Sequence, residues 1–243
     1  MTSLPDRRFP VFDHDQAYYH ARQRWSRAIA LRGFLFHSLL RVETHGLANI
    51  PREGGGLLMM NHRAALDPVV MQGVVFPRTL CVMSKIENFR IPAVQQMMRL
   101  WGCYPIERAT LDRRALDYTL RILRAGELVL IAPEGHRADA LQPARDGLPF
   151  LATRADGFVI PVGLRGTRGV AASWQRLRPA RIDVTFGRPF RFRSAGKMPA
   201  RRRDLAIMTT EAMYQLAALL DAPQRGIYSD LSKSTTDTLE FLP

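Results

Sequence analysis

The sequence has few cysteines and no long apolar run. Its two cysteines, Cys81 and Cys103, stand 22 positions apart with neither a CxxC spacing nor a histidine at a zinc-ligand interval. This argues against a disulfide framework or zinc module and favours a reduced cytosolic pair. The most apolar region, residues 28–42, is interrupted by Arg32 and His37, whereas a bilayer span needs about 20 apolar residues. We therefore predict no transmembrane helix, and no signal peptide at residues 1–10.

Lysine is scarce, although the chain is strongly basic. The 243 residues include 35 basic and 22 acidic side chains, a formal net charge of +13, and 32 of the basic residues are arginine. This balance implies an anionic partner such as nucleic acid, a phospholipid surface or a phosphorylated substrate. Arginine suits bidentate contacts to phosphate, although a coding bias toward arginine explains the excess equally well. The 47% apolar residues exclude a disordered chain and suit one domain spanning 1–243.

Short apolar runs alternate with amphipathic segments through the middle of the chain. We predict strands at residues 56–60, 79–83, 104–106, 128–131 and 158–162, and helices at 68–75, 92–101, 111–124 and 148–155. The alternating segment 181–186 predicts an edge or antiparallel strand. Strands separated by helices predict an α/β fold with a mostly parallel sheet covered by helices on both faces.

The two ends of the chain differ from this middle. Residues 15–42 mix arginine with tryptophan, phenylalanine and leucine, which is typical of an amphipathic helical segment on an anionic membrane surface and equally of a helix packed over the sheet. Residues 200–220 predict a C-terminal packing helix, and we expect residues 222–243 to be loosely ordered. No repeat or clear linker divides the chain, so we predict a single domain.

A histidine and an aspartate follow the first predicted strand. His62 comes two residues after it, and Asp67 stands just before Pro68, where a helix is expected to begin. The two side chains can meet if the chain turns between them. Taken alone, Asp67 is equally well explained as a helix N-cap and His62 as a structural histidine at a strand end.

Further polar residues follow the next predicted strands. Arg108 comes after the strand at 104–106, and Glu134 and Arg137 come after the strand at 128–131; residues 160–163 close a fourth strand. In open parallel sheets, ligands bind at the carboxyl ends of the strands. We therefore expect these side chains to share one crevice with His62.

Together these segments resemble the sequence blocks of the glycerolipid acyltransferases, the HX4D acyltransferases typified by 1-acyl-glycerol-3-phosphate acyltransferase. The family's Asn-His block with its aspartate corresponds to residues 61–67, its glycine-to-arginine block to 102–108, its Pro-Glu-Gly block to 133–137 and its Val-Pro block to 160–162. The likeness extends from about residue 42 to about residue 187. Ala132 replaces the family's aromatic residue and His136 its small hydroxyl residue, which leaves the acceptor's identity open.

The resemblance implies transfer of a fatty acyl group from a thioester, acyl-CoA or acyl carrier protein, to a lysophospholipid hydroxyl in phospholipid biosynthesis, within a catalytic core at residues 43–190. The expected acceptor is 1-acyl-glycerol-3-phosphate. His62 would be the general base, and Asp67 would hold its tautomer and stabilise the imidazolium. The expected substrate-binding residues are Lys85, Arg108, Glu134, Gly135 and Arg137. The cations would hold the acceptor's phosphate, and Glu134 would order Arg137 or bind a glycerol hydroxyl.

The resemblance also sets expectations for cofactors and partners. Such acyl transfer needs no metal and no cofactor, so we expect none. A metal site formed by His62, Asp67, Glu134 and His136 would lack a recognised ligand spacing. The sequence around Cys103 does not mark it as an activated nucleophile. We expect peripheral association with an anionic membrane surface, on its cytoplasmic side.

The sequence leaves three alternative functions open. The chain can be an acyltransferase acting on a different lipid hydroxyl, or a non-catalytic basic lipid-binding protein that kept the fold. A nucleic-acid-binding protein is the third, but basic residues are spread along the chain and no helix-turn-helix, zinc-finger or RNP-like motif is present. We therefore expect no nucleic-acid partner.

Overall fold

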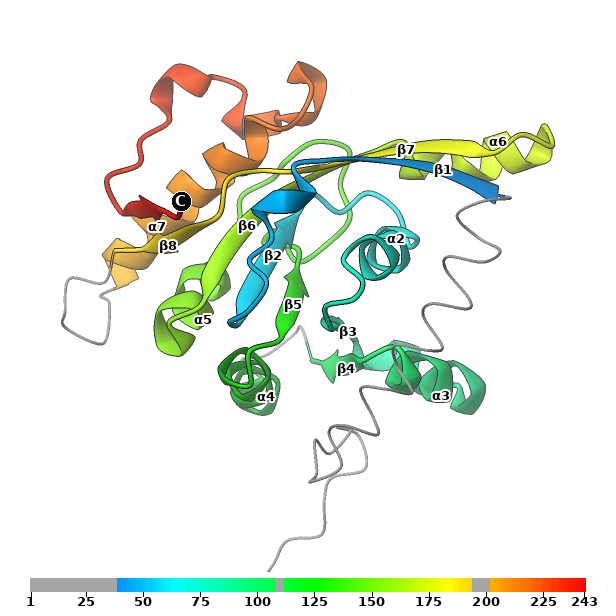
Figure 1. The fold of residues 1–243 in the computed structure, drawn as a ribbon, viewed down its shortest axis with the longest axis horizontal. Coiled ribbons are helices and arrows are strands. Elements are labelled where there is room, and N and C mark those ends of the chain that lie inside the picture. The colour runs from blue at the N-terminus through cyan, green and yellow to red at the C-terminus, as the bar shows by residue number, and fades with distance from the viewer. Residues whose placement is uncertain (1–38, 108–111, 194–201) are drawn as a thin grey trace, which may run out of the picture.

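Within the residues that the structure describes, the strands form one mixed nine-stranded sheet with strand order β1-β7-β6-β2-β5-β3-β4 and with β8 pairing to β6 and β9. The computed structural model describes residues 39–107, 112–193 and 202–243 (Figure 1). The strands are β1 (Leu40–His45), β2 (Gly56–Met60), β3 (Leu80–Lys85), β4 (Cys103–Ile106), β5 (Leu128–Ile131), β6 (Phe158–Arg165), β7 (Ala180–Phe186), β8 (Phe190–Phe192) and β9 (Leu239–Phe241). The α-helices are α2 (Asp67–Val74), α3 (Pro92–Leu100), α4 (Arg113–Arg124), α5 (Gly147–Ala155), α6 (Val170–Gln175) and α7 (Arg202–Ala217).

Strands β6, β2, β5, β3 and β4 are neighbours in this order and run parallel to one another. Their carboxyl ends therefore lie along one edge, which we call the carboxyl edge. Strand β7 pairs antiparallel with β6 and parallel with β1. Any side chain placed just after β2, β3, β4 or β5 is thereby brought to the same edge.

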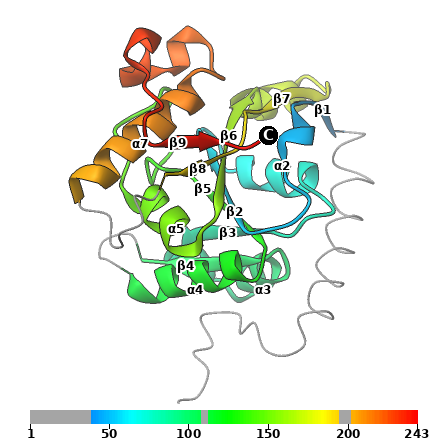
Figure 2. The same ribbon diagram turned by 60° about the vertical axis from the view of Figure 1, so that its left-hand side comes forward.

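The central strand β2 is buried on both faces. Leu57 and Met59 pack into an apolar cluster with residues of α4, α5 and α7, whereas Leu58 and Met60 pack into a second cluster with α2. Successive strand side chains point to opposite faces, so a continuous apolar run fits a sheet covered on both sides. Figure 2 shows α5 and α7 on one side of β2 and β6, and α2 on the other. The predicted α/β fold, mostly parallel and covered on both faces, is confirmed.

The structure corrects predictions about individual elements. Residues 40–42, assigned to the helical segment at 15–42, begin β1; the rest of that segment up to residue 38 lies outside the described residues. The segment 181–186, predicted as an edge or antiparallel strand, lies in β7, which is antiparallel to β6; the edge alternative is excluded, because β1 pairs along the other side of β7. Its alternating pattern instead reflects a sheet face that is left partly exposed: Arg181 is exposed while Ile182 and Val184 are buried.

Another error concerns the C-terminal residues 222–243, which are ordered rather than loose. They form three short 3-10 helices, η5 (Ala222–Gln224), η6 (Gly226–Tyr228) and η7 (Leu231–Lys233), and end in β9. The buried carboxylate of Glu211 on α7 accepts hydrogen bonds from the hydroxyls of Thr235 and Thr238 and from the amides of Asp237 and Thr238. This anchor, which lies far from the tail in sequence, fixes the segment against α7.

The remaining 3-10 helices follow strands at both ends of the sheet. The 3-10 helix η3 (Ile86–Phe89) follows β3, and η4 (Thr167–Gly169) leads from β6 into α6; η2 (Leu47–Asn49) follows β1. Strand β6 continues three residues beyond the predicted end at residue 162, so residues 160–163 lie inside the strand rather than closing it. Within the described residues, no helix combines the length and apolar character needed to cross a membrane.

Candidate active site

The side chains of His62 and Asp67 meet just beyond the end of β2. His62 Nδ1 lies 2.9 Å from Asp67 Oδ2, with the aspartate side chain fully buried and the histidine side chain 13% exposed. The backbone amides of Arg63 and Ala64 donate to the same oxygen over 2.7 and 2.8 Å. The chain between the two residues therefore turns around the carboxylate, as the acyltransferase-like spacing requires.

Asp67 is therefore not an N-cap, the alternative left open by the sequence. It is the first residue of α2, the capping position is Leu66, and no side chain caps the helix there. Its Oδ2 receives three hydrogen bonds from the preceding turn, while its buried Oδ1 has no hydrogen-bond partner among the described residues. The carboxylate is thus committed to holding His62 and its loop.

The hydrogen bonds of His62 define its tautomer. A carboxylate at Nδ1 requires a proton on that nitrogen, which leaves the lone pair on Nε2. Arg137 Nε donates toward His62 Nε2 over 3.4 Å, which is consistent with an unprotonated Nε2. The basic nitrogen therefore points toward the loop that follows β5, and the backbone of this loop is tied to the same histidine because Ala138 N donates to His62 O.

Asn61, the residue before the histidine, has a structural role that sequence reasoning missed. Its side chain donates to Leu164 O and accepts from Leu164 N, at 3.0 and 2.8 Å. These paired bonds join the end of β2 to β6 and fix the point at which the chain leaves the sheet toward His62. The Asn-His dipeptide was the available signal, but nothing in the sequence names Leu164 as its partner.

Glu134 is buried in the loop after β5. Burial raises the pKa of Glu134, and the hydrogen bond from the Gln142 amide and the nearby imidazoles oppose the rise. Gln142 N lies 2.8 Å from its Oε1, so the carboxylate organises its own loop. Gly135 has φ +77°, a left-handed conformation that glycine adopts without strain. His136 Nδ1 bonds to the Glu134 carbonyl at 2.9 Å.

Two cavities adjoin His62. The first, the cationic pocket, has a volume of about 700 Å³ and is lined by His62, Lys85, His136 and Arg137 together with apolar residues of α2 and α3. The second, the apolar cavity, has a volume of about 230 Å³ and lies between the sheet and helices α4 and α5. Most of its wall is apolar and includes Leu116, Leu130, Leu148 and Leu151, and Glu107, Asp112 and Arg145 also border it. His62, Pro68, Val82 and Met83 line both. The histidine therefore stands where a charged compartment meets an apolar one.

Most of the predicted site residues come together at the carboxyl edge. His62, Lys85 and Arg137 line the cationic pocket, Gly135 lines the apolar cavity, and Asp67 and Glu134 support them from buried positions. Arg108 lies outside the described residues. Sequence reasoning also missed Gln72, whose buried side chain bonds to the carbonyls of Leu80 and Trp101 and lines the cationic pocket. A glutamine within an otherwise apolar helix was the available signal.

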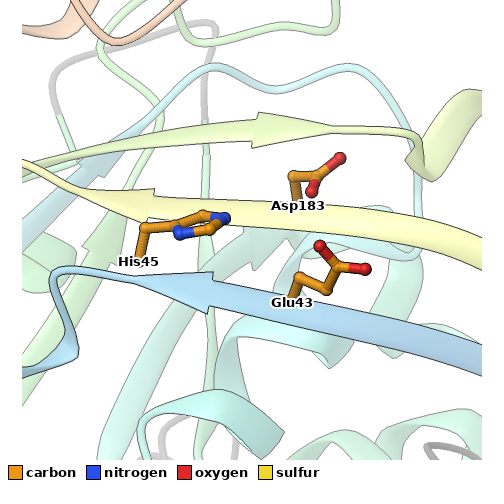
Figure 3. Close-up of side chains that lie close together, drawn as sticks. All are labelled: Glu43, His45 and Asp183. Atoms are coloured by element: carbon orange, nitrogen blue, oxygen red, sulfur yellow. The ribbon is translucent and has the colours of Figure 1, made fainter.

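A separate group of polar side chains lies on β1 and β7. The potential ligand atoms of Glu43, His45 and Asp183 all lie within 4.8 Å of one another (Figure 3). Arg181 Nη2 lies 2.9 Å from Glu43 Oε1, and both side chains are exposed. Because this guanidinium already supplies a positive charge, the group is explained as an ion-paired cluster on an open sheet surface.

Comparisons with known proteins agree with the geometry. Residues 41–165 match the protein-family model described as Acyltransferase. The 1-acyl-sn-glycerol-3-phosphate acyltransferase of Bacillus subtilis is 21% identical over 72% of this chain and 85% of its own length; that of Streptococcus pneumoniae is 27% identical over 63% of this chain and 57% of its own length. The crystal structure of the 1-acyl-sn-glycerophosphate (LPA) acyltransferase PlsC from Thermotoga maritima shares the fold, with a TM-score of 0.57 and 20% identity over 83% of this chain and 81% of that one.

Proposed function

The chain belongs to the acyltransferase family, and from this premise we propose that it transfers a fatty acyl group from a thioester to a hydroxyl of a lysophospholipid. The expected acceptor is 1-acyl-glycerol-3-phosphate, and the donor is acyl-CoA or acyl carrier protein. The observation that carries this proposal is the His62–Asp67 pair at the junction of the cationic pocket and the apolar cavity. A lysophospholipid and an acyl thioester need such a junction, because both carry charge and a long apolar chain.

The hydrogen bonds of His62 suit a general base. Asp67 holds the Nδ1 proton, so Nε2 accepts the acceptor's hydroxyl proton as the oxygen attacks the thioester carbonyl. A C–O bond forms, the C–S bond breaks, and the imidazolium returns its proton to the departing thiolate. Asp67 stabilises the imidazolium during this exchange. The alcohol attacks the donor directly, so the scheme needs no acyl-enzyme, metal or cofactor.

The two cavities support a division of the substrates. Lys85 and Arg137 in the cationic pocket would bind the acceptor's phosphate, with the arginine able to form paired hydrogen bonds. The leucine-lined cavity would hold an acyl chain, since burial of each methylene there contributes about 0.8 kcal/mol. Arg137 Nε rests 3.4 Å from His62 Nε2. A phosphate that draws this guanidinium away would free the base for the hydroxyl.

A second candidate is an acyltransferase acting on another lipid hydroxyl. Ala132 lines the apolar cavity and His136 lines the cationic pocket, so both departures from the family's sequence blocks lie where the substrates are expected to bind. A smaller side chain at residue 132 and an imidazole at residue 136 alter the volume and charge that the acceptor meets. An acceptor with a different headgroup would fit this altered pocket.

Membrane association belongs to the same proposal. Lipid substrates reside in a bilayer, and the chain carries a net charge of +13, which favours an anionic surface. The part of the amphipathic segment that precedes β1, residues 15–38, is the proposed peripheral anchor on the cytoplasmic side. Deleting residues 15–38 and measuring vesicle binding tests that part of the proposal, and unchanged binding would assign attachment elsewhere.

A thiol-release assay tests the reaction. It pairs two donors, acyl-CoA and acyl carrier protein, with a panel of lysophospholipids and other hydroxylated lipids. We expect thiol release that depends on the acceptor, and a loss of about 10²- to 10⁴-fold in His62→Ala. His45→Ala is the matched control, because His45 is exposed and lies on β1. Normal turnover by folded His62→Ala would refute the mechanism, and no acceptor-dependent release by the parent would favour a non-catalytic lipid-binding protein.

A further inference from the structure

The turn between α6 and β7 exposes a leucine between two arginines. Leu177 is 95% exposed, and Arg176 and Arg178 on either side of it are also exposed. Within the part of the chain that the structure describes, neither of these arginines forms an ion pair. Residues 165–181 contain five arginines and no acidic residue. The turn therefore combines an unshielded positive charge with an apolar tip.

The backbone holds Leu177 outward in an unfavourable conformation. Arg176 N and Arg178 N both donate to Ser173 O over 3.0 Å, and Leu177 N donates to Trp174 O over 2.9 Å. These bonds end α6 with Leu177 at φ +53°, the left-handed position where helices usually place glycine. A leucine there gains no burial and carries the strain of a side chain at positive φ. Within the described residues, neither burial nor backbone conformation explains a leucine at this position.

The turn projects from the same edge of the sheet as the candidate active site. Strand β6 ends at the carboxyl edge, and η4 and α6 follow it directly. Asp139 pairs with Arg168 of η4 and with Arg63, the residue after the proposed base, at 3.6 Å from Arg63 Nη2. Trp174 at the end of α6 is partly exposed and donates its Nε1 proton to Leu39 O. Figure 1 shows α6 at the outer end of the β1–β7 pair.

We propose that residues 173–178, the end of α6 and the turn that follows it, bind an anionic phospholipid surface. Leu177 enters the interface, Arg176 and Arg178 pair with lipid phosphates, and Trp174 lies at headgroup depth, where aromatic rings with a polar atom are favoured. Charge complementarity selects lipid that carries net negative charge. Binding through this turn would bring the carboxyl edge, with the candidate active site, close to the bilayer. The benefit of that placement rests on the proposed function, but lipid binding by the turn does not.

The first variant, Leu177→Gly, removes the apolar tip while relieving the backbone strain. We expect its partition into vesicles of phosphatidylcholine and phosphatidylglycerol to weaken about tenfold, with a thermal midpoint at least as high as that of the parent chain. Ile227→Ser is the matched control, because Ile227 is also an exposed apolar residue. Equal partition of parent and Leu177→Gly would overturn the role of the leucine.

The second variant, Arg176→Gln/Arg178→Gln, removes the charge. Each surface cation contributes about fivefold to binding of an anionic bilayer, so we expect a loss of about thirtyfold that shrinks at high salt. Arg113→Gln/Arg121→Gln on the exposed side of α4 is the control. If the turn variant binds vesicles as the parent does, or loses only binding to a DNA duplex, the lipid surface is refuted.

Measurements of thiol release distinguish lipid binding by the turn from the proposed acyl transfer. With a short-chain acceptor dissolved as monomers, both turn variants should release thiol at the parent's rate. With the acceptor embedded in vesicles, both should be slower. An inactive parent whose vesicle binding still depends on the turn would refute the proposed reaction and leave the lipid contact standing. An active parent whose binding ignores the turn would refute the contact alone.

Discussion

Replacing Asp67 by asparagine tests the proposed mechanism most directly. The carboxylate accepts three hydrogen bonds on one oxygen, from His62, Arg63 and Ala64. An amide oxygen can still accept them but carries no charge. Because a hydrogen bond to a charged group contributes about 1.5–3 kcal/mol and a neutral one about 0.5–1.5 kcal/mol, the three together weaken by about 3 kcal/mol. Relief of burying an ionised carboxylate offsets part of this, and we expect a net loss of about 1–3 kcal/mol in unfolding free energy.

The catalytic loss should be larger than this structural one. The asparagine side chain of the variant would no longer balance the charge of the imidazolium, and its amide group could turn toward Nδ1 and favour the wrong tautomer. We expect kcat to fall by about 10²- to 10⁴-fold, equivalent to roughly 3–5 kcal/mol of transition-state stabilisation. Initial rates of thiol release at saturating donor and acceptor measure kcat, and urea unfolding measures the stability.

The control for this experiment is Glu211→Gln. Glu211 is also a buried carboxylate that accepts several hydrogen bonds, but it anchors the C-terminal tail to α7. The variant should lose stability to a similar extent while keeping its kcat. If Asp67→Asn keeps kcat within about threefold of the parent, or if Glu211→Gln loses activity equally, then Asp67 does not act through His62 and the mechanism is refuted.

Three further predictions concern phosphate binding and pH. Arg137→Ala should raise the KM for the phosphate-bearing acceptor about tenfold or more and the KM for the thioester far less. Steady-state kinetics measure both constants, and equal increases would contradict the role of Arg137 in binding the acceptor's phosphate. Burial raises the pKa of Glu134, so above the unfolded pKa of about 4.3 its ionised form lowers the stability of the folded chain. Glu134→Gln should therefore be at least as stable as the parent at pH 7. Unfolding measured below about pH 4 should show no such advantage, because the carboxyl group is then protonated in both states. Burial alone would raise the pKa of Glu211, but its hydrogen bonds outweigh burial and lower it. Its stabilisation should therefore be present at pH 7 and lost as the pH falls through the folded pKa, so that parent and Glu211→Gln converge in acid.

The continuous apolar strands were the most predictable part of the fold. Residues 128–131 form β5 as expected, because a short run of four apolar residues fits a strand covered on both faces. The pairing of β7 could not be predicted in the same way. Its alternating pattern indicates one exposed face but does not identify the neighbouring strands. The pairing of β1 along the side of β7 away from β6 was therefore not predicted.

Some features of the candidate site were likewise predictable from the sequence, and others were not. The positions of His62, Glu134 and Arg137 after parallel strands predicted that they would share one edge, because parallel strands end together. The same reasoning could not show that Glu134 bonds to Gln142 instead of Arg137. It also could not show the two cavities, because their walls come from helices that approach the sheet only in the folded chain.

The sequence by itself determined the α/β class, the order of the central elements and the spacing that lets one turn join a histidine to an aspartate. These follow from local periodicity and chain geometry, which neighbouring residues specify. Only the tertiary structure decided which compartments flank His62, that Glu211 orders the tail and that Leu177 stands exposed between two arginines. Such features depend on segments distant in the chain, because burial and contact are set by packing rather than by sequence neighbours.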